Sequence, residues 1–182
     1  NSSEHAGRKR DDTAGLHGNR QGDGMATTTF IKFDGIEGEA THKDHKGEIE
    51  VLSWTWGVSN ASHGAGGGSG KGKATPGDLH LTHRYDKASP VLSKFCANGK
   101  HFKEAVITSR KAGKGQKDFL KITMKEVFIT SVQPSGSSGG DLIESVSMSY
   151  GSIDFAYKPQ DEKGGLGGEV KFGWNVKTTE IT

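Results

Sequence analysis

A glycine-rich run contains the residues of this sequence that come nearest to a nucleotide-phosphate site. Gly67, Gly72 and Lys73 have the spacing of a P-loop, in which backbone N–H groups and a lysine hold the phosphates. A P-loop also needs Ser or Thr directly after the lysine, and a helix that begins there. Here Ala74 follows the lysine, and the Thr-Pro-Gly after it leads into a strand-like segment. We therefore interpret the run as a connecting loop and keep a nucleotide hydrolase only as a minor alternative.

The histidines do not have the pattern of a metal site. His42 and His45 flank Asp44, but a zinc site needs three or four ligands and no further pair of ligands is evident. His80 and His83 are three residues apart on a predicted strand, so they point to opposite faces. We expect His83 to pack in the core and His80 to meet solvent or a neighbouring subunit, with no bound metal or other cofactor.

Signals for hydrolysis or nucleic-acid binding are equally weak. The sequence has no Gly-x-Ser-x-Gly elbow, and alternation points Asp154 outward between apolar neighbours. Lys117, Lys121 and Lys125 recur on one strand face, but the interleaved aromatic residues of a nucleic-acid platform are missing. We therefore predict a protein that is not an enzyme and does not bind nucleic acid.

The composition of the chain favours a β-rich domain. Only 31% of the 182 residues are apolar, while 28 are glycine, a mixture typical of short strands joined by tight turns. The net charge of +2 gives no electrostatic reason to expect a nucleic-acid or membrane partner. Cys96 is the single cysteine, no apolar run could cross a bilayer, and no cleaved signal peptide is visible. We expect folding in a reducing cytoplasm, and any export by another route.

Alternation of apolar and polar residues predicts most of the elements. Residues 1–24 lack periodicity, so we expect a disordered upstream extension followed by a single domain over residues 25–182. The predicted strands cover 30–33, 48–58, 78–85, 104–110, 117–132, 144–157 and 170–176. The apolar face changes within 48–58 and again at Gly151, as β-bulges and barrel corners require. We predict a mainly β fold, a compact and nearly closed barrel of antiparallel strands.

One short helix is expected beside this barrel. In residues 86–99, Ser89 can cap the helix, Pro90 suits its first turn and Gly99 ends it. The apolar stripe at helical spacing consists of Val91, Leu92, Phe95 and Cys96. We interpret Cys96 as a small core residue on that stripe.

One strand segment points to assembly. Val127, Phe128 and Ile129 are apolar on both faces of the predicted strand, although one face of a lone barrel should meet water. Both faces must then be covered, either by the helix or by another chain.

Several motifs in order resemble the haemolysin-coregulated protein (Hcp) family of bacterial type VI secretion. They are FIKFDGIEGE, HKGEIEVLSWTWG, DKASPVL, RKAG, ITMKEVFITSV, YKPQ and FGWNV, and the match covers residues 26–180. The resemblance implies a β-barrel flanked by a helix, assembled as a hexameric ring with a wide channel. Rings of this family stack into the inner tube of a contractile injection machine, carry the spike on the tip and can hold small effectors.

The resemblance also implies where assembly contacts lie. The loop 38–47 and the Gly-rich loop 60–77 match positions through which rings contact each other. Our candidate ring-stacking residues are Thr41, His42, Lys43, Asp44, His45, Lys46 and Glu48. The turn 134–140 matches a lumen-side turn, with Ser135, Ser137 and Ser138 as candidates, and Val127 to Ile129 are candidates for packing between protomers.

The implied partners are further copies of the chain, type VI spike and sheath proteins, and small effectors. The implied location is the cytoplasm of a Gram-negative bacterium, then the exterior or a target cell, without membrane insertion. The alternative is a monomeric β-barrel that binds glycans or peptides on a platform of Trp54, Trp56 and Trp174.

Overall fold

A computed structural model describes residues 26–61, 74–112, 115–163 and 165–182. The expected upstream extension, residues 1–24, and most of the glycine-rich run lie outside these residues. The described strands are β1 (Thr27–Phe33), β2 (Ile49–Thr55), β3 (Val58–Asn60), β4 (Ala74–Pro76), β5 (Leu79–Arg84), β6 (His101–Lys111), β7 (Asp118–Ser135), β8 (Ile143–Ser149), β9 (Ser152–Tyr157), β10 (Val170–Asn175) and β11 (Glu180–Ile181), with one helix, α1 (Ser89–Asn98).

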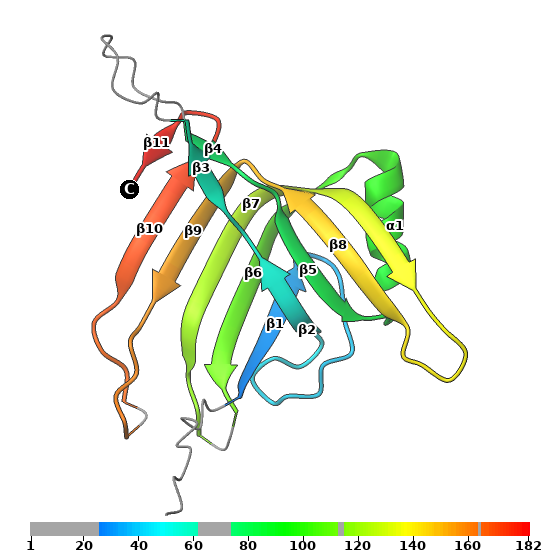
Figure 1. Ribbon diagram of the computed structural model, residues 1–182, viewed down its shortest axis with the longest axis horizontal. Coiled ribbons are helices and arrows are strands. Elements are labelled where there is room, and N and C mark those ends of the chain that lie inside the picture. The colour runs from blue at the N-terminus through cyan, green and yellow to red at the C-terminus, as the bar shows by residue number, and fades with distance from the viewer. Residues whose placement is uncertain (1–25, 62–73, 113–114, 164) are drawn as a thin grey trace, which may run out of the picture.

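Six strands close into an antiparallel barrel in the order β7-β6-β1-β2-β5-β8 (Figure 1). The 18-residue strand β7 makes closure possible because it pairs with β6 along its first part and with β8 along its second. At Phe128 the two pairings meet, with His101 opposite on one side and Ser149 on the other. The predicted barrel with a single flanking helix is therefore confirmed.

The core follows the alternation of the sequence. On β1 the buried side chains include Ile31 and Phe33, and on β5 Leu79 and Leu81 are buried beside His83. Further fully buried apolar side chains come from α1 and from strands β6 to β9, among them Leu92, Ala105, Ile107, Ile122, Met124, Val127, Met148 and Ile153. The inward positions of these strands thus fill the barrel, as half-buried strands require.

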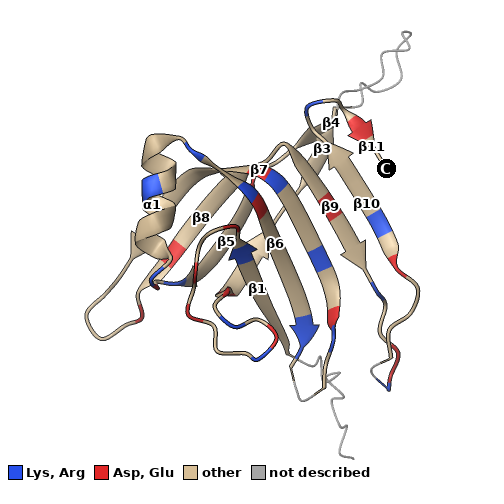
Figure 2. Cartoon of the chain, turned by 180° about the vertical axis from the view of Figure 1, so that it is seen from behind, with Lys and Arg blue, Asp and Glu red and all other residues tan. Residues whose placement is uncertain are grey.

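Strands β9, β10 and β11 continue the sheet beyond the barrel, and we call them the wing. The wing is joined to the barrel because β9 pairs with the first part of β7. Strand β8 pairs with the same edge of β7 further along the strand. Seen from behind, β7, β9 and β10 carry interspersed basic and acidic residues (Figure 2), and Lys121, Asp154 and Lys171 among them are exposed. The wing therefore has a polar outer face, and an inner face that continues the barrel core.

Local irregularities explain where the apolar face changes. The pairing of β2 with β5 shifts register between Val51 and Ser53, which agrees with the predicted change of face in residues 48–58. The chain also bends at Gly151, between β8 and β9. On β7, Glu126 has a positive φ of 51°, and beyond it the inward positions move from even to odd numbers.

This change at Glu126 corrects the interpretation of the doubly apolar stretch. Val127 and Ile129 both point into the core, at 0% and 5% exposure, and Phe128 alone points outward. Among the described residues, therefore, only the outward face of this stretch remains exposed, at Phe128.

The helix begins one residue earlier than predicted. Ala88 is the N-cap, with no side-chain hydrogen bond, and the Ser89 hydroxyl instead accepts a hydrogen bond from the backbone N–H of Asp86. Pro90 lies in the first turn, and Gly99 ends the helix with a φ of 67°, both as predicted. None of the helical segments that the structure describes has the length and apolar character that crossing a membrane requires.

Some predicted strand bounds were wrong, and alternation did not always mark a buried side chain. Tyr157 and Val170 alternate with core residues at the ends of β9 and β10 yet are exposed, and Tyr85 is exposed directly after β5. The predicted strand 48–58 divides into β2 and β3, and β3 pairs with β4 as a separate two-stranded ribbon. Sequence alternation also missed β11, which pairs with the end of β10.

Candidate functional site

The candidate stacking loop, residues 38–47, is a compact turn that hydrogen-bonds to itself. The Gly38 N–H donates to the Gly47 carbonyl at 2.7 Å, and the Gly47 N–H donates to the Ala40 carbonyl at 2.9 Å. A Cβ on Gly38 would lie 2.4 Å from the Glu48 carbonyl oxygen, so only glycine fits there. The loop therefore has a defined shape, in which Thr41, Lys43, Asp44 and Lys46 are exposed while His45 is buried.

His45 attaches this loop to the barrel. Its ring stacks on Phe30 of β1, with centroids 4.5 Å apart and planes 11° apart. Its Nδ1 lies 3.0 Å from Glu48 Oε2, and its Nε2 lies 3.1 Å from Asp118 Oδ1 at the start of β7. A histidine that first suggested a metal ligand is thus held between two carboxylates.

Arg110 of β6 completes the cluster. Its Nε donates to Asp118 Oδ1 and its guanidinium donates to Asp44 Oδ2, both at 2.8 Å, although the side chain is only 7% exposed. Burial would raise the pKa of the Asp118 carboxyl, but hydrogen bonds from Arg110 and His45 outweigh burial and lower that pKa. The hydrogen bond from Arg110 also lowers the pKa of Asp44. We call Asp44, His45, Glu48, Arg110 and Asp118 the loop cluster.

Two members of the loop cluster were missed by sequence reasoning. Arg110 and Asp118 lie opposite each other across the β6–β7 hairpin, where the register shifts. Their places beside a predicted turn could have indicated a cross-strand ion pair. Their contacts with the loop 38–47 join residues more than 60 positions apart, and no local pattern encodes such contacts.

The other candidate residues occupy separate places. Ser135 ends β7, and Ser137 and Ser138 lie in the exposed turn that follows, where the Gly140 N–H donates to the Ser137 carbonyl. Phe128, 40% exposed, contacts the ring of His101 at 5.2 Å. The structure therefore does not bring the loop, the turn and the Val127–Ile129 segment into one site.

The inner face of the wing becomes less covered toward one end. In the first cross-strand row, Met124, Ile153 and Trp174 are all buried. The second row is Ile122, Phe155 and Phe172, and Trp56 packs over it with centroids 4.9 Å from Phe155 and 6.2 Å from Phe172. The third row is Leu120, Tyr157 and Val170, where Tyr157 is 45% and Val170 63% exposed.

The third row is an apolar surface continuous with the core, and we call it the open row. Such a surface is stabilised when another surface covers it. The alternation of the predicted strands 144–157 and 170–176 continues through Tyr157 and Val170, so it records the apolar character of these positions but not their incomplete cover.

The tryptophans do not gather as an exposed binding platform. Trp174 is 6% exposed, and Trp54 and Trp56 pack partly buried against the core. The Trp56 indole N–H donates to the Tyr150 hydroxyl at 2.5 Å, which in turn donates to the Gly77 carbonyl at 2.8 Å. These contacts favour a packing role over the glycan- or peptide-binding alternative.

The remaining chemical signals lie apart from one another. Gly67, Gly72 and Lys73 fall outside the described residues, but Ala74 to Pro76 form strand β4, where a P-loop would need a helix. His80 is exposed and His83 fully buried, as predicted. Among residues that the structure describes, no three His, Cys, Asp or Glu side chains are grouped to hold a metal.

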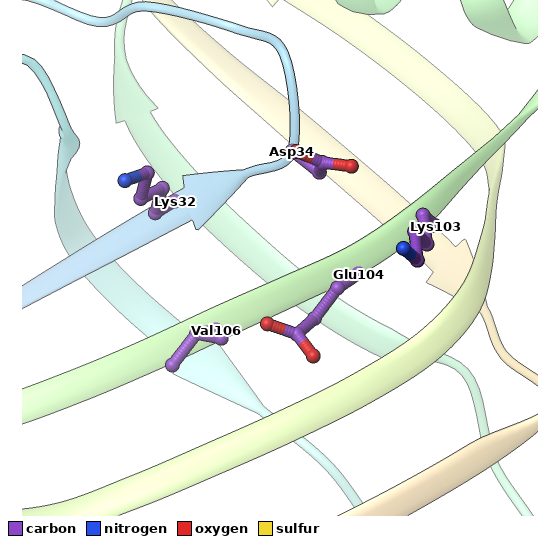
Figure 3. A pocket seen from close by; sticks show the side chains of 5 residues that line it. All are labelled: Lys32, Asp34, Lys103, Glu104 and Val106. Carbon is purple, nitrogen blue, oxygen red and sulfur yellow. The ribbon is translucent and has the colours of Figure 1, made fainter.

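The barrel wall carries a shallow charged depression along β1 and β6. Lys32, Asp34, Lys103, Glu104 and Val106 line it, and their charged ends are spread along the strands (Figure 3). Two lysines and two carboxylates leave no concentrated charge of either sign. The depression therefore lacks the few convergent polar groups in an apolar cavity that mark a small-molecule site.

Comparisons with known proteins agree with one another. The family model described as "Type VI secretion system effector, Hcp" matches residues 30–157. Protein hcp1 of Pseudomonas aeruginosa is 43% identical over 157 residues, which cover 84% of this chain and 97% of that protein. A solved structure described as a type six secretion system protein has a TM-score of 0.81 at 31% identity, covering 86% of this chain and all of that one. The crystal structure of Hcp1 from Salmonella typhimurium has a TM-score of 0.71 at 35% identity, and the match covers 87% of this chain and all of that one.

Proposed function

This chain belongs to the Hcp family of type VI secretion proteins, a family of structural secreted proteins rather than enzymes, and from this premise we propose a specific role. Six copies form a ring, rings stack into the inner tube of the secretion machine, and the tube is exported when the machine fires. Small effectors travel in the lumen. The chain thus begins in the bacterial cytoplasm, contacts spike and sheath proteins, and ends outside the cell.

The open row carries this proposal. Tyr157 and Val170 continue the apolar inner face of the wing and stay 45% and 63% exposed, although Phe119 meets the Tyr157 ring edge-on with centroids 6.3 Å apart. Burying a valine side chain fully is favourable by about 1.5–3 kcal/mol relative to leaving it in water. Covering the open row would therefore stabilise a complex between two copies. A neighbouring copy that covers the row supports assembly through the wing.

A ring is the closed form of such an assembly. The wing of one copy and the barrel of the next are different surfaces, so the contact between copies is heterologous. A series of such contacts forms a ring when the rotation from one copy to the next adds up to a full turn. Strand β9 pairs with the whole length of β10 on one edge, whereas β11 pairs on the other edge only with Trp174 and Asn175. The first residues of β10 therefore have no partner strand on that second edge among the described strands. This free strand edge is a second feature that a neighbour would satisfy.

The remaining contacts are assigned by region. In our proposal the exposed side chains of loop 38–47, chiefly Thr41, Lys43 and Lys46, meet the next ring in the stack. Ser135, Ser137 and Ser138 lie toward the lumen, where small side chains leave room for an effector. Phe128 packs against a neighbouring protomer, since Val127 and Ile129 already lie in the core of their own chain.

The experiment that tests ring formation is mass photometry of Tyr157→Glu beside Tyr157→Phe. We expect six subunits for the native chain and for Tyr157→Phe, which keeps the aromatic area. A carboxylate at this position would have to be buried in the interface, so Tyr157→Glu should run as single subunits with unchanged circular dichroism. A native chain that stays monomeric at every concentration, with no annular particles in negative stain, would overturn the proposal.

A further inference from the structure

Buried charges fasten the loop 38–47 to the barrel. We propose that Arg110 and His45 are positioning residues that hold this loop in its stacking shape, and that protonation of His45 sets how firmly the loop is held. This inference rests on the proposed function in one respect, because ring stacking is its functional consequence. The positioning itself is a property of the single chain.

The contacts of His45 require both ring nitrogens to donate. Nδ1 faces Glu48 Oε2 at 3.0 Å and Nε2 faces Asp118 Oδ1 at 3.1 Å, and a carboxylate oxygen only accepts hydrogen bonds. A neutral imidazole has one N–H, so one of its lone pairs would face a carboxylate. Only the doubly protonated ring satisfies both contacts at once.

The charge of the loop cluster favours the same form. Asp44, Glu48 and Asp118 supply three carboxylates, and Arg110 supplies one guanidinium. A neutral His45 leaves two negative charges uncompensated within the cluster, whereas a protonated His45 leaves one. His45 is 5% and Arg110 7% exposed, so water screens these two cations only weakly, whereas Asp44 and Asp118 remain partly exposed.

Among the residues that the structure describes, no charged side chain besides Glu48 and Asp118 is within hydrogen-bond distance of the His45 ring. From β6 come Arg110, already bonded to two carboxylates, and the neutral Thr108 hydroxyl, 3.4 Å from Nδ1. From β1 comes the ring of Phe30. Within the loop, His42 accepts the backbone N–H of Asp44 at its Nδ1, and the flanking Lys43 and Lys46 are exposed.

The loop cluster is the main tie between the loop and the strands behind it. The backbone bonds of the loop run between its own residues and Glu48, so they shape the loop without attaching it. At its start, Glu37 and Glu39 contact Lys87, but these contacts are exposed. Loss of the His45 proton would therefore loosen the loop from β6 and β7, and rings should stack less strongly as the pH rises.

The test follows the pH dependence of His45 and the loop in the full chain. Deuterium exchange at the imidazole C2 reports protonation of His45, and amide exchange of peptides covering 38–48 reports the loop, corrected for the intrinsic rate. When the C2 exchange shows that His45 has lost its proton, we expect loop exchange to rise about tenfold or more, as loss of one charge-assisted hydrogen bond implies. Over the same change of pH, sedimentation should show stacked rings separating into single rings.

Matched variants make the test specific. His45→Gln can donate one hydrogen bond at any pH, so its loop exchange and its stacking should be independent of pH. His80→Gln changes an exposed histidine on β5 and should keep the native profile. Arg110→Lys retains the charge but loses the forked geometry, so its loop should exchange faster at every pH.

The outcomes separate this inference from the proposed function. A flat native profile of loop exchange, or a His45→Gln variant with the native profile, would overturn the positioning role of His45. If the protein forms no rings, the proposed function fails, but the exchange profile of the loop still decides the inference. If rings form and stack equally at all pH values while the loop loosens, the link to stacking is wrong.

Discussion

The least expected residues of the barrel are the buried ionisable pair His83 and Glu144. They lie opposite each other on β5 and β8, both 0% exposed, with His83 Nε2 2.9 Å from Glu144 Oε1. Among described residues, His83 Nδ1 and Glu144 Oε2 have no hydrogen-bond partner. Desolvation also raises the pKa of the nearby half-buried Asp86 carboxyl. Such a pair is sensitive to the loss of either member.

We predict that Glu144→Ala destabilises the fold by about 3–5 kcal/mol, because it leaves the His83 ring buried without its partner. The free energy of unfolding in urea measures this. Asp141→Ala removes the exposed partner of Arg84, the next residue on β5, and should change that free energy very little. If His83→Leu combined with Glu144→Leu is as unstable as Glu144→Ala, an unpaired buried group is not the cause.

At the scale of elements, the alternation of the sequence was sufficient to predict most strands and the helix. Strand β5 illustrates why: Leu79, Leu81 and His83 are buried, and His80 between them is exposed. The pattern failed where a strand extends beyond the core, as at Tyr157 and Val170. Alternation shows that a side chain is apolar, but it does not show whether other residues pack against that side chain. It also failed at Glu126, where one positive φ reverses the inward positions of β7.

Closure of the barrel and the loop cluster could not be predicted from local patterns. The second part of β7 pairs with β8 and its first part with β9, which depends on long-range packing. The position of the loop 38–47 as a candidate contact came from family resemblance. Its attachment to Arg110 and Asp118 joins the loop to a hairpin more than 60 positions away, a contact that no local pattern encodes.

The loop 38–47 also gives a prediction at the element scale. Gly38→Ala would place a Cβ 2.4 Å from the Glu48 carbonyl oxygen, so the base of the loop has to open, at about 1–3 kcal/mol. Gly57→Ala adds the same atom where nothing lies within 4 Å and should be tolerated. Amide exchange over residues 38–48 should rise in Gly38→Ala alone. Equal exchange in the two variants would mean that this close backbone approach does not shape the loop.

The whole molecule is a closed barrel that carries an incompletely covered sheet extension. Trp56 covers the second row of the wing, and the open row beyond it is only partly covered by the described chain. The barrel can therefore complete its own core, while the wing depends on a neighbour. Oligomerisation and stability should then be linked by mass action.

We predict that the melting temperature of the native protein rises with its concentration. Because the neighbour binds only the folded wing, a tenfold increase should stabilise each subunit by about 1 kcal/mol, or about 2–4 °C. Val170→Lys places a charge in the open row and should remove the dependence, whereas Val170→Ile keeps the apolar surface and should retain it. Differential scanning calorimetry at three concentrations measures the effect. A concentration-independent native transition in protein that runs as six subunits would mean that the ring contact adds nothing to the stability of the wing.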